Sequence, residues 1–290
     1  MSEHTIHSSQ TKIPVGFFLA LQGYIKFILG FSAMEVVAGI AYIGLFFLKP
    51  FPKTARVFRR YMFTLTTKSM LFFMSVQVIA TGKPPKKPYF MVGNHLGYVD
   101  ILVLATMTGA TFVSKKEVRK WPGIGGVSAL YNTIFINREN RADVVRVSRL
   151  ITENIKQGEG VILFPEGTSS AGQVVLPFNS SLFDFPAKNN FPVHTFTIRY
   201  ETGHKKLPAS HVVAWWGDID FLPHTRQMLA TRRIKAYVEF HEVTHCSSQR
   251  KELAELTHQA ISKNFKPTET YPISDHRVLQ SQEAEISSIM

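Results

Sequence analysis

The chain has 290 residues, enough for one large domain with an appendage and for a sizeable buried core. Its 45% apolar content excludes wholesale disorder, and its single cysteine excludes a disulfide framework or a cage of several cysteines around a metal. The net charge of +12 favours an anionic partner, such as nucleic acid, anionic lipid or an acidic carrier, and the 23 phenylalanines point first to a membrane surface.

Two long apolar runs follow a polar N-terminus that lacks the basic start of a secretory signal. The first run covers residues 27–48 with one charge, Glu35, and the second covers residues 61–80 with only Lys68 charged. A helix of about 22 residues just crosses a hydrocarbon layer about 30 Å thick. The connector between the runs is basic and lacks acids, as suits anionic headgroups. Its basic residues are Lys49, Lys53, Arg56, Arg59 and Arg60.

The charges around these runs constrain their topology. If both runs crossed the membrane, the basic connector would lie in the cytoplasm and everything after residue 80 outside. Yet Lys83, Lys86 and Lys87 follow at once, and the rest of the chain forms no disulfides. We therefore expect a helical hairpin that dips into one leaflet from the cytoplasmic face. A first run that spans alone, or two buried core helices, are the alternatives.

The remaining two thirds of the chain alternate between strand and helix patterns, which predicts an α/β domain with a mixed, largely parallel sheet flanked by helices. We divide the chain into N-terminal membrane-embedded helices with a basic linker (1–88), an α/β domain (89–266) and a polar, loose tail (267–290). The predicted strands are 89–92, 111–114, 133–137, 161–164, 193–200, 211–215 and 234–240. The predicted helices are 101–107, 126–131, 142–157, 180–187 and 248–264.

The first candidate site, NHLGYVD, runs from Asn94 to Asp100 directly after a predicted strand. A histidine can accept the proton of a hydroxyl nucleophile, and a carboxylate on its other ring nitrogen holds the useful tautomer. His95 and Asp100 would have to meet through a turn from loop to helix, because residues five apart on a straight helix point in different directions. The alternative is a histidine at a strand end and an aspartate that caps the next helix.

Two further strand ends carry groups that can bind an anion. FPEGTSS follows the strand at 161–164, and Gly167 permits a tight turn whose backbone N–H groups can cradle an anion. Arg138 ends the run TIFINR, where a guanidinium can fork onto a phosphate. An ordinary turn and a solvated charge are the alternatives. Chemistry in open α/β sheets usually lies beyond such carboxyl ends of strands.

These motifs, taken together, resemble the glycerolipid acyltransferases, which include the 1-acyl-glycerol-3-phosphate (lysophosphatidate) acyltransferases. That family carries NHxxxxD, a block ending in FI(D/N)R, then FPEGT, then an apolar strand that contains proline. All four occur here in this order between residues 89 and 200. With the N-terminal helices the resemblance covers most of the chain, and NHxxxxD together with FPEGT is a specific pair.

The resemblance implies an O-acyltransferase that moves a fatty acyl group from a thioester to the hydroxyl of a lysolipid, forming phosphatidate from 1-acyl-sn-glycerol-3-phosphate in phospholipid biosynthesis. His95 would take the hydroxyl proton while Asp100 orients its ring. Backbone N–H groups of residues 166–168 would steady the oxyanion. The predicted substrate-binding residues are Asn94, Arg138, Glu166, Gly167, Thr168 and Ser169.

The resemblance also implies the partners. The acyl donor would be acyl carrier protein or acyl-coenzyme A, and the enzyme would act at the cytoplasmic face of a membrane. No metal, cofactor or nucleic acid is expected. A basic group can receive the acidic donor or is simply a solvated face; its members are Lys115, Lys116, Arg119 and Lys120.

Two departures from the family pattern bear on the acceptor. Members that form phosphatidate commonly have arginine directly after FPEGT, where this chain has Ser169, and Thr195 stands where a second proline is usual. The stretches 164–183 and 214–224 look more like the lyso-ornithine-lipid and lysophospholipid acyltransferase branches. Acylation of a lyso-ornithine lipid or another lysophospholipid is therefore the alternative function.

Two rival functions come from other features of the chain. His241 to His245 reads HEVTH and matches HExxH, the signature of zinc proteases, which requires both histidines on one helix. The surrounding residues alternate and are β-branched, so we expect a strand there, with the two histidines about 13 Å apart. A non-catalytic lipid-binding protein on the same fold is the other rival.

Overall fold

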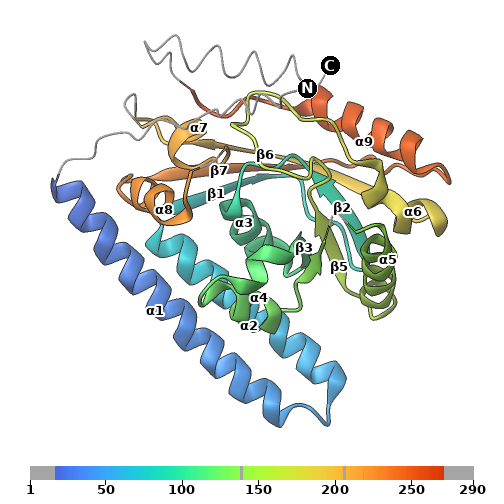
Figure 1. Cartoon of the computed structure of the whole chain (residues 1–290), viewed down its shortest axis with the longest axis horizontal. Helices are drawn as coiled ribbons and strands as arrows, with labels where there is room; N and C mark the ends of the chain where they lie inside the picture. Colours follow the sequence, from blue (N-terminus) through green and yellow to red (C-terminus); the bar gives the residue numbers. More distant parts are fainter. Residues whose placement is uncertain (1–16, 138–139, 205–206, 218, 271–290) are drawn as a thin grey trace, which may run out of the picture.

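The structure, a computed structural model, describes residues 17–137, 140–204, 207–217 and 219–270. Within these residues, seven strands form one sheet in the order β1-β7-β6-β2-β5-β3-β4, with helices on both of its faces (Figure 1). The strands are β1 (Val76–Thr81), β2 (Tyr89–Gly93), β3 (Thr111–Lys115), β4 (Ile134–Ile136), β5 (Gly160–Leu163), β6 (Val193–Glu201) and β7 (Ile234–Phe240). The helices are α1 (Phe17–Phe47), α2 (Pro52–Phe73), α3 (Tyr98–Thr108), η1 (Lys116–Lys120), α4 (Ile124–Leu130), α5 (Arg141–Lys156), η2 (Ser180–Phe183), α6 (Asp184–Lys188), α7 (Ala209–Val212), α8 (Phe221–Leu229) and α9 (Arg250–Asn264).

The sheet is mixed and mostly parallel, which confirms the predicted fold class. β2 pairs in parallel with β5 on one side and with β6 on the other, and every residue of β2 is buried. A strand covered on both faces is expected to be apolar throughout, as YFMVG is. Only β7 runs antiparallel to its neighbour β6, while β1 lies parallel to β7 at the edge.

Alternate residues of β2 enter two separate cores, as the period of a strand requires. Tyr89 and Met91 pack with α2, α3, α7 and α8 on one face of the sheet. Phe90 and Val92 pack with α5, α6 and α9 on the other face. His95 follows this central strand, so both cores fix the position of the strand end that carries it.

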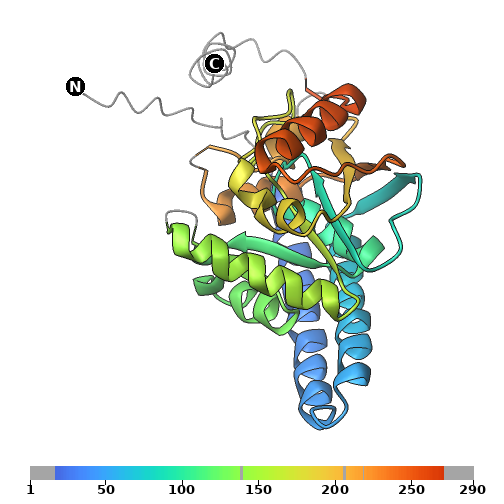
Figure 2. The same cartoon turned by 90° about the vertical axis from the view of Figure 1, so that its right-hand side faces the viewer.

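The two N-terminal helices form the predicted hairpin, which extends away from the sheet (Figure 2). α1 turns small side chains inward: a Cβ atom at Gly30 would lie only 3.1 Å from the Cβ of Phe73 on α2. Its outward face is mostly apolar from Phe17 to Phe47, with Glu35 as an exposed charge. Among the described helices, α1 is the one long and apolar enough to cross a membrane.

The second apolar run was wrongly assigned as a single helix over residues 61–80. α2 begins earlier, at Pro52, and ends at Phe73; Ser75 then adopts a left-handed φ of 58°, and Val76–Thr81 forms the edge strand β1. VQVIAT is rich in β-branched residues, which favour an extended backbone, but hydropathy alone does not separate it from the helix before it. The sheet therefore takes one strand from the segment before the linker at 81–88.

Three other expectations need correction. The strand predicted at 211–215 is instead the short, buried helix α7 and a turn, because a continuous apolar run does not distinguish a strand from a buried helix. α8 was not predicted. Most of the predicted tail lies outside the described residues, but its start is not loose: Thr268 is buried and its N–H donates to Gly172 O at 2.8 Å.

Candidate active site

The side chains of His95 and Asp100 meet at the carboxyl end of β2. His95 Nδ1 lies 2.8 Å from Asp100 Oδ2. Asp100 is three residues into α3, and the turn through Leu96 and Gly97 folds its carboxylate back onto the histidine. The second ring nitrogen of His95, Nε2, is thereby left to accept a proton. His95 also lines a cavity.

Asp100 is fully buried, and both of its oxygens accept hydrogen bonds from the protein. Besides His95, Oδ2 accepts the backbone N–H groups of Leu96 at 2.6 Å and Gly97 at 3.1 Å. Oδ1 accepts the hydroxyl of Tyr200, which lies on β6 and is itself buried, at 2.6 Å. A buried carboxylate requires such donors, and together they fix its position. Sequence reasoning missed Tyr200, since nothing local links it to a residue a hundred positions earlier.

The loop after β5 lies beside His95 because β2 and β5 are parallel neighbours. Glu166 Oε1 accepts the backbone N–H of His95 at 3.1 Å, and Ser170 N–H donates to His95 O at 3.0 Å. Burial raises the pKa of Glu166 well above its ordinary value. Gly167 makes the turn with a φ of 78°.

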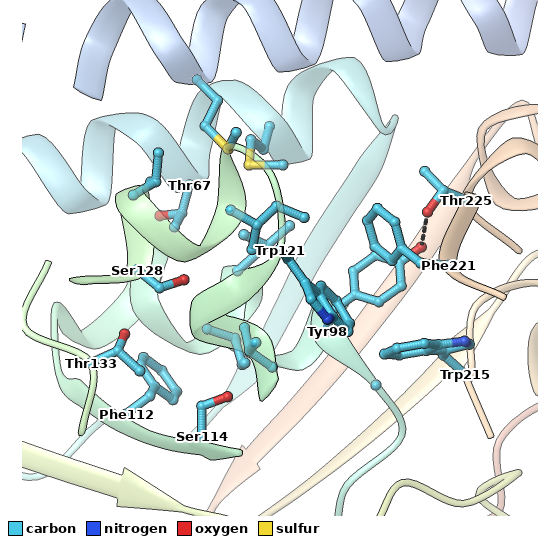
Figure 3. A pocket seen from close by; sticks show the side chains of 18 of the residues that line it. Thr67, Tyr98, Phe112, Ser114, Trp121, Ser128, Thr133, Trp215, Phe221 and Thr225 are labelled. Atoms are coloured by element: carbon cyan, nitrogen blue, oxygen red, sulfur yellow. Dashed lines mark hydrogen bonds between the residues drawn. The ribbon is translucent and has the colours of Figure 1, made fainter. Parts of the chain in front are cut away.

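A cavity of about 470 Å³ opens beside His95 and runs under the helical hairpin, between α1, α2, α3 and α4. Most of its lining is apolar, with Phe31, Met70 and Ile101 among the side chains. Its lining also carries hydroxyl groups, including those of Ser128 and Thr133 (Figure 3). A cavity of this size and lining accommodates an extended apolar ligand.

Four aromatic rings gather on one side of this cavity (Figure 3). The rings of Tyr98 and Phe221 lie 5.1 Å apart, and those of Trp121 and Trp215 lie 5.5 Å apart. Ser169 donates its hydroxyl to Trp215 O, which joins the loop after β5 to this aromatic cluster. The cluster was missed as a unit because α8, which carries Phe221, was not predicted.

The predicted substrate-binding residues divide into three groups. Gly167, Thr168 and Ser169 line the cavity together with His95. Asn94 and Glu166 are buried behind it, and both ends of the Asn94 amide bind the backbone of Ile198, at 2.8 Å each. Arg138 lies outside the described residues.

The sequence model of the family described as Acyltransferase matches residues 75–199, which hold β2, β5 and the two motifs just described. A lyso-ornithine lipid O-acyltransferase of Brucella abortus is 31% identical over 179 residues, covering 58% of this chain and 67% of the relative. The chain belongs to the acyltransferase family. It is therefore an O-acyltransferase, which takes an acyl group from a donor and passes it to a lysolipid acceptor.

Two further comparisons extend this result. A 1-acyl-sn-glycerol-3-phosphate acyltransferase of Neisseria gonorrhoeae is 30% identical over 138 residues, covering 46% of this acyltransferase and 54% of the relative. The crystal structure of the 1-acyl-sn-glycerophosphate acyltransferase PlsC from Thermotoga maritima covers 85% of this chain and 95% of that one, with a TM-score of 0.61. At 20% identity, that likeness concerns the fold.

The HExxH motif of this acyltransferase does not lie on a helix. β7 ends at Phe240, and His241 and His245 donate their N–H groups to Thr195 O and Val193 O of β6, both at 3.0 Å. Since Thr195 and Val193 are two residues apart, the segment between the histidines bulges, and the expected separation of 13 Å for a straight strand does not hold. Among the described residues, no group of three or more metal-ligating side chains is present.

A buried hydrogen-bond chain supports the aromatic cluster from behind. Tyr98 OH lies 3.1 Å from His224 Nδ1 and 3.0 Å from Thr225 Oγ1, and His224 Nε2 lies 3.0 Å from Ala214 O. Because Ala214 O only accepts, His224 carries its proton on Nε2 and accepts the tyrosine hydroxyl at Nδ1. Burial lowers the pKa of His224 to about 4.

This histidine makes the stability of the acyltransferase depend on pH. Between about pH 4 and pH 6.5 the unfolded chain binds a proton at His224 that the folded chain does not, so the free energy of unfolding falls as the pH is lowered through this range. The full effect is about 3 kcal/mol. Urea unfolding at pH 7 and pH 4.5 checks this: His224→Asn is expected to weaken the pH dependence. An equal pH dependence in both proteins would contradict the assignment.

Proposed function

We propose that this protein transfers a fatty acyl group from a thioester to the hydroxyl of a lyso-ornithine lipid, with His95 as general base. The observation that carries the proposal is the 2.8 Å contact of His95 Nδ1 with the buried carboxylate of Asp100, on the wall of an apolar cavity. Relatives named lyso-ornithine lipid O-acyltransferases, which cover 58% and 62% of this chain, support the acceptor.

The reaction follows from this arrangement in two steps. Nε2 of His95 takes the proton of the acceptor hydroxyl as its oxygen attacks the thioester carbonyl, and Asp100 stabilises the imidazolium that forms. The carbon–sulfur bond then breaks, the ester forms, and the leaving thiolate takes the proton from His95. The N–H groups of Thr168 and Ser169 are candidate oxyanion donors, since both residues border the cavity and neither N–H makes a hydrogen bond to the backbone of the described residues.

The cavity supports acyl chains as ligands. Its walls come from α1, α2 and α3, and each methylene buried against them contributes about 0.8 kcal/mol of transfer free energy. The cavity begins at His95 and Ser169, so a chain bound there places its polar end beside the general base. This geometry is what acyl transfer between two lipid-like substrates requires.

The residue after FPEGT, Ser169, bears on the headgroup of the acceptor. Where phosphatidate-forming acyltransferases commonly have arginine, this serine is short, uncharged and bonded to Trp215 O. An ornithine headgroup, which carries both an ammonium and a carboxylate, depends less on a cation at this place than a phosphate monoester does. Lysophosphatidate is the second candidate, because relatives that act on it also match this chain.

Two surfaces of the protein suit the acyl donor and the membrane. The basic group at the end of β3 and in η1 suits an acidic acyl carrier protein or the phosphates of acyl-coenzyme A; Lys115 borders the cavity and Lys120 is exposed. The exposed apolar face of α1 supports a hairpin that lies in one leaflet at the cytoplasmic face. Both chains of the substrates are then within reach of the cavity.

Initial rates of the purified protein test the acceptor. Lyso-ornithine lipid, lysophosphatidate and lysophosphatidylcholine are each combined with acyl carrier protein and coenzyme A thioesters, and lyso-ornithine lipid is expected to give the highest kcat/KM. Ser169→Arg is expected to raise kcat/KM for lysophosphatidate relative to lyso-ornithine lipid about tenfold, through charge-assisted hydrogen bonds. A wild-type preference for lysophosphatidate would favour the second candidate, and transfer to none would refute both.

A further inference from the structure

A second, small cavity lies at the amino ends of the parallel strands, whereas His95 lies at their carboxyl ends. Thr111 begins β3 there, and Glu159 directly precedes β5, whereas His95 follows the far end of β2. The volume of this cavity is about 30 Å³, enough for one or two water-sized groups. α2 supplies one wall through Arg56, Arg59 and Arg60. Neutral polar side chains supply part of the rest, among them those of Asn132, Asn154 and Gln157.

Positive charge exceeds negative charge around this cavity. Glu159, which is only 7% exposed, forms ion pairs with Arg60 at 3.2 Å and with Lys87 at 3.4 Å. Lys87 also donates to Gly109 O at 2.8 Å, which holds it in place. One carboxylate thus faces four cations when Arg56 and Arg59 are included.

Arg59 is the group in this cluster whose bonding is incomplete. Its Nε atom is buried and has no hydrogen-bond partner. Burial lowers the pKa of Arg59, and the nearby Arg56 lowers it further, while Glu159 raises it. A buried guanidinium N–H without an acceptor costs free energy that an added oxyanion would recover.

We propose that this cavity binds a phosphate group, with Arg56, Arg59 and Arg60 as donors, carried by an anionic membrane lipid or free in solution. A guanidinium presents parallel N–H groups that match phosphate oxygens. Two oxygens of the phosphate enter the cavity and the remainder stays at its opening, as the volume requires. No part of the acyl-transfer chemistry uses these residues.

The other side of α2 favours a lipid as the source of this phosphate. Val57 and Tyr61 are exposed on the same turns of the helix that carry the three arginines. When these apolar side chains enter a leaflet, the arginines come to lie at the depth of the headgroups. An anionic headgroup bound there would hold α2 against the membrane and against the sheet at once.

The experiment compares variants that remove one positive charge from α2. Arg59→Gln and Arg56→Gln change the cavity, and Lys53→Gln removes an exposed charge from the same helix outside it. One arm measures the thermal midpoint of the detergent-solubilised full chain in phosphate and in chloride at equal ionic strength. The other measures binding to phosphatidylcholine vesicles with and without phosphatidylglycerol. Circular dichroism confirms that each variant folds, and Arg56→Gln replaces Arg59→Gln if the latter does not.

Phosphate is expected to raise the midpoint of the wild type and of Lys53→Gln but not of Arg59→Gln. The affinity gained from phosphatidylglycerol is expected to fall at least tenfold in Arg59→Gln, as for a lost charge-assisted hydrogen bond, and about fivefold in Lys53→Gln, as for any surface charge. If Arg59→Gln loses only vesicle affinity, the site binds a lipid headgroup. If Arg59→Gln loses only the rise of the midpoint in phosphate, the site binds free phosphate. No effect in either arm, or equal losses in Lys53→Gln and Arg59→Gln, would overturn the proposal.

Discussion

Replacing His95 with alanine is expected to lower the rate of acyl transfer by about a hundredfold to ten-thousandfold, the usual contribution of a general base. The imidazole borders the cavity, and its Nδ1 is held by the carboxylate of Asp100. The side chain of His95 is 20% exposed, so its loss leaves no large void in either core. The variant is therefore expected to fold. It lacks the base that removes the proton from the acceptor hydroxyl, so transfer is expected to be slow.

Steady-state transfer from a radiolabelled thioester, with binding of the lysolipid measured separately, checks this expectation. His241→Ala is the matched control, because it removes a partly buried histidine from the HExxH motif, away from the cavity. The control is expected to keep its activity, whereas a zinc hydrolase would lose it. Substantial transfer by His95→Ala would end the assignment of the base. Lysolipid binding by a wild type that transfers nothing would instead support a non-catalytic lipid-binding protein.

The second large effect is expected from Asp100→Asn, which should lower kcat about a thousandfold or more. Oδ2 of Asp100 accepts three hydrogen bonds, from His95 Nδ1 and from the N–H groups of Leu96 and Gly97. An amide oxygen can occupy that place, but it lacks the negative charge that stabilises the imidazolium during transfer. An amide nitrogen in the same place would face two N–H donors and fail to accept either.

Tyr200→Phe separates the charge of Asp100 from its positioning. The variant keeps the carboxylate and removes only the hydroxyl that donates to Oδ1, so kcat is expected to fall roughly tenfold with KM unchanged. Initial rates across acceptor concentration distinguish kcat from KM, and thermal unfolding shows whether the variant is folded. Activity of Asp100→Asn within tenfold of the wild type would contradict the role of this carboxylate. An Asp100→Asn effect no larger than that of Tyr200→Phe would reduce Asp100 to a structural role.

The central strands and the histidine–aspartate contact could be predicted from the sequence because their determinants are local. β2 and β5 are short apolar runs bounded by turn residues, and Asp100 follows His95 closely enough for one turn to join them. Strand ends that are parallel neighbours lie side by side, which brought Gly167 next to His95 as expected from the motif order.

The features that could not be predicted depend on contacts between distant segments. Tyr200 reaches Asp100 across the sheet, and Trp215 meets Tyr98 only because α7 and α8 fold over α3. Nothing in their own neighbourhoods marks these aromatic residues as part of the site. The roles of the residues around the cavity stay predictions, which the substitutions above test.

The strand β1 ties the catalytic half of the molecule to the hairpin before it. Residues 76–81 continue from α2 and hydrogen-bond along β7, whose other edge is occupied by β6. Trimming the chain at the linker after residue 81, to obtain a smaller water-soluble fragment, would strip β7 of a partner and leave a row of open backbone groups. Since β1 is itself the edge strand of the intact sheet, such a fragment would move the open edge to β7, and a shortened form of the catalytic half has to begin before residue 76.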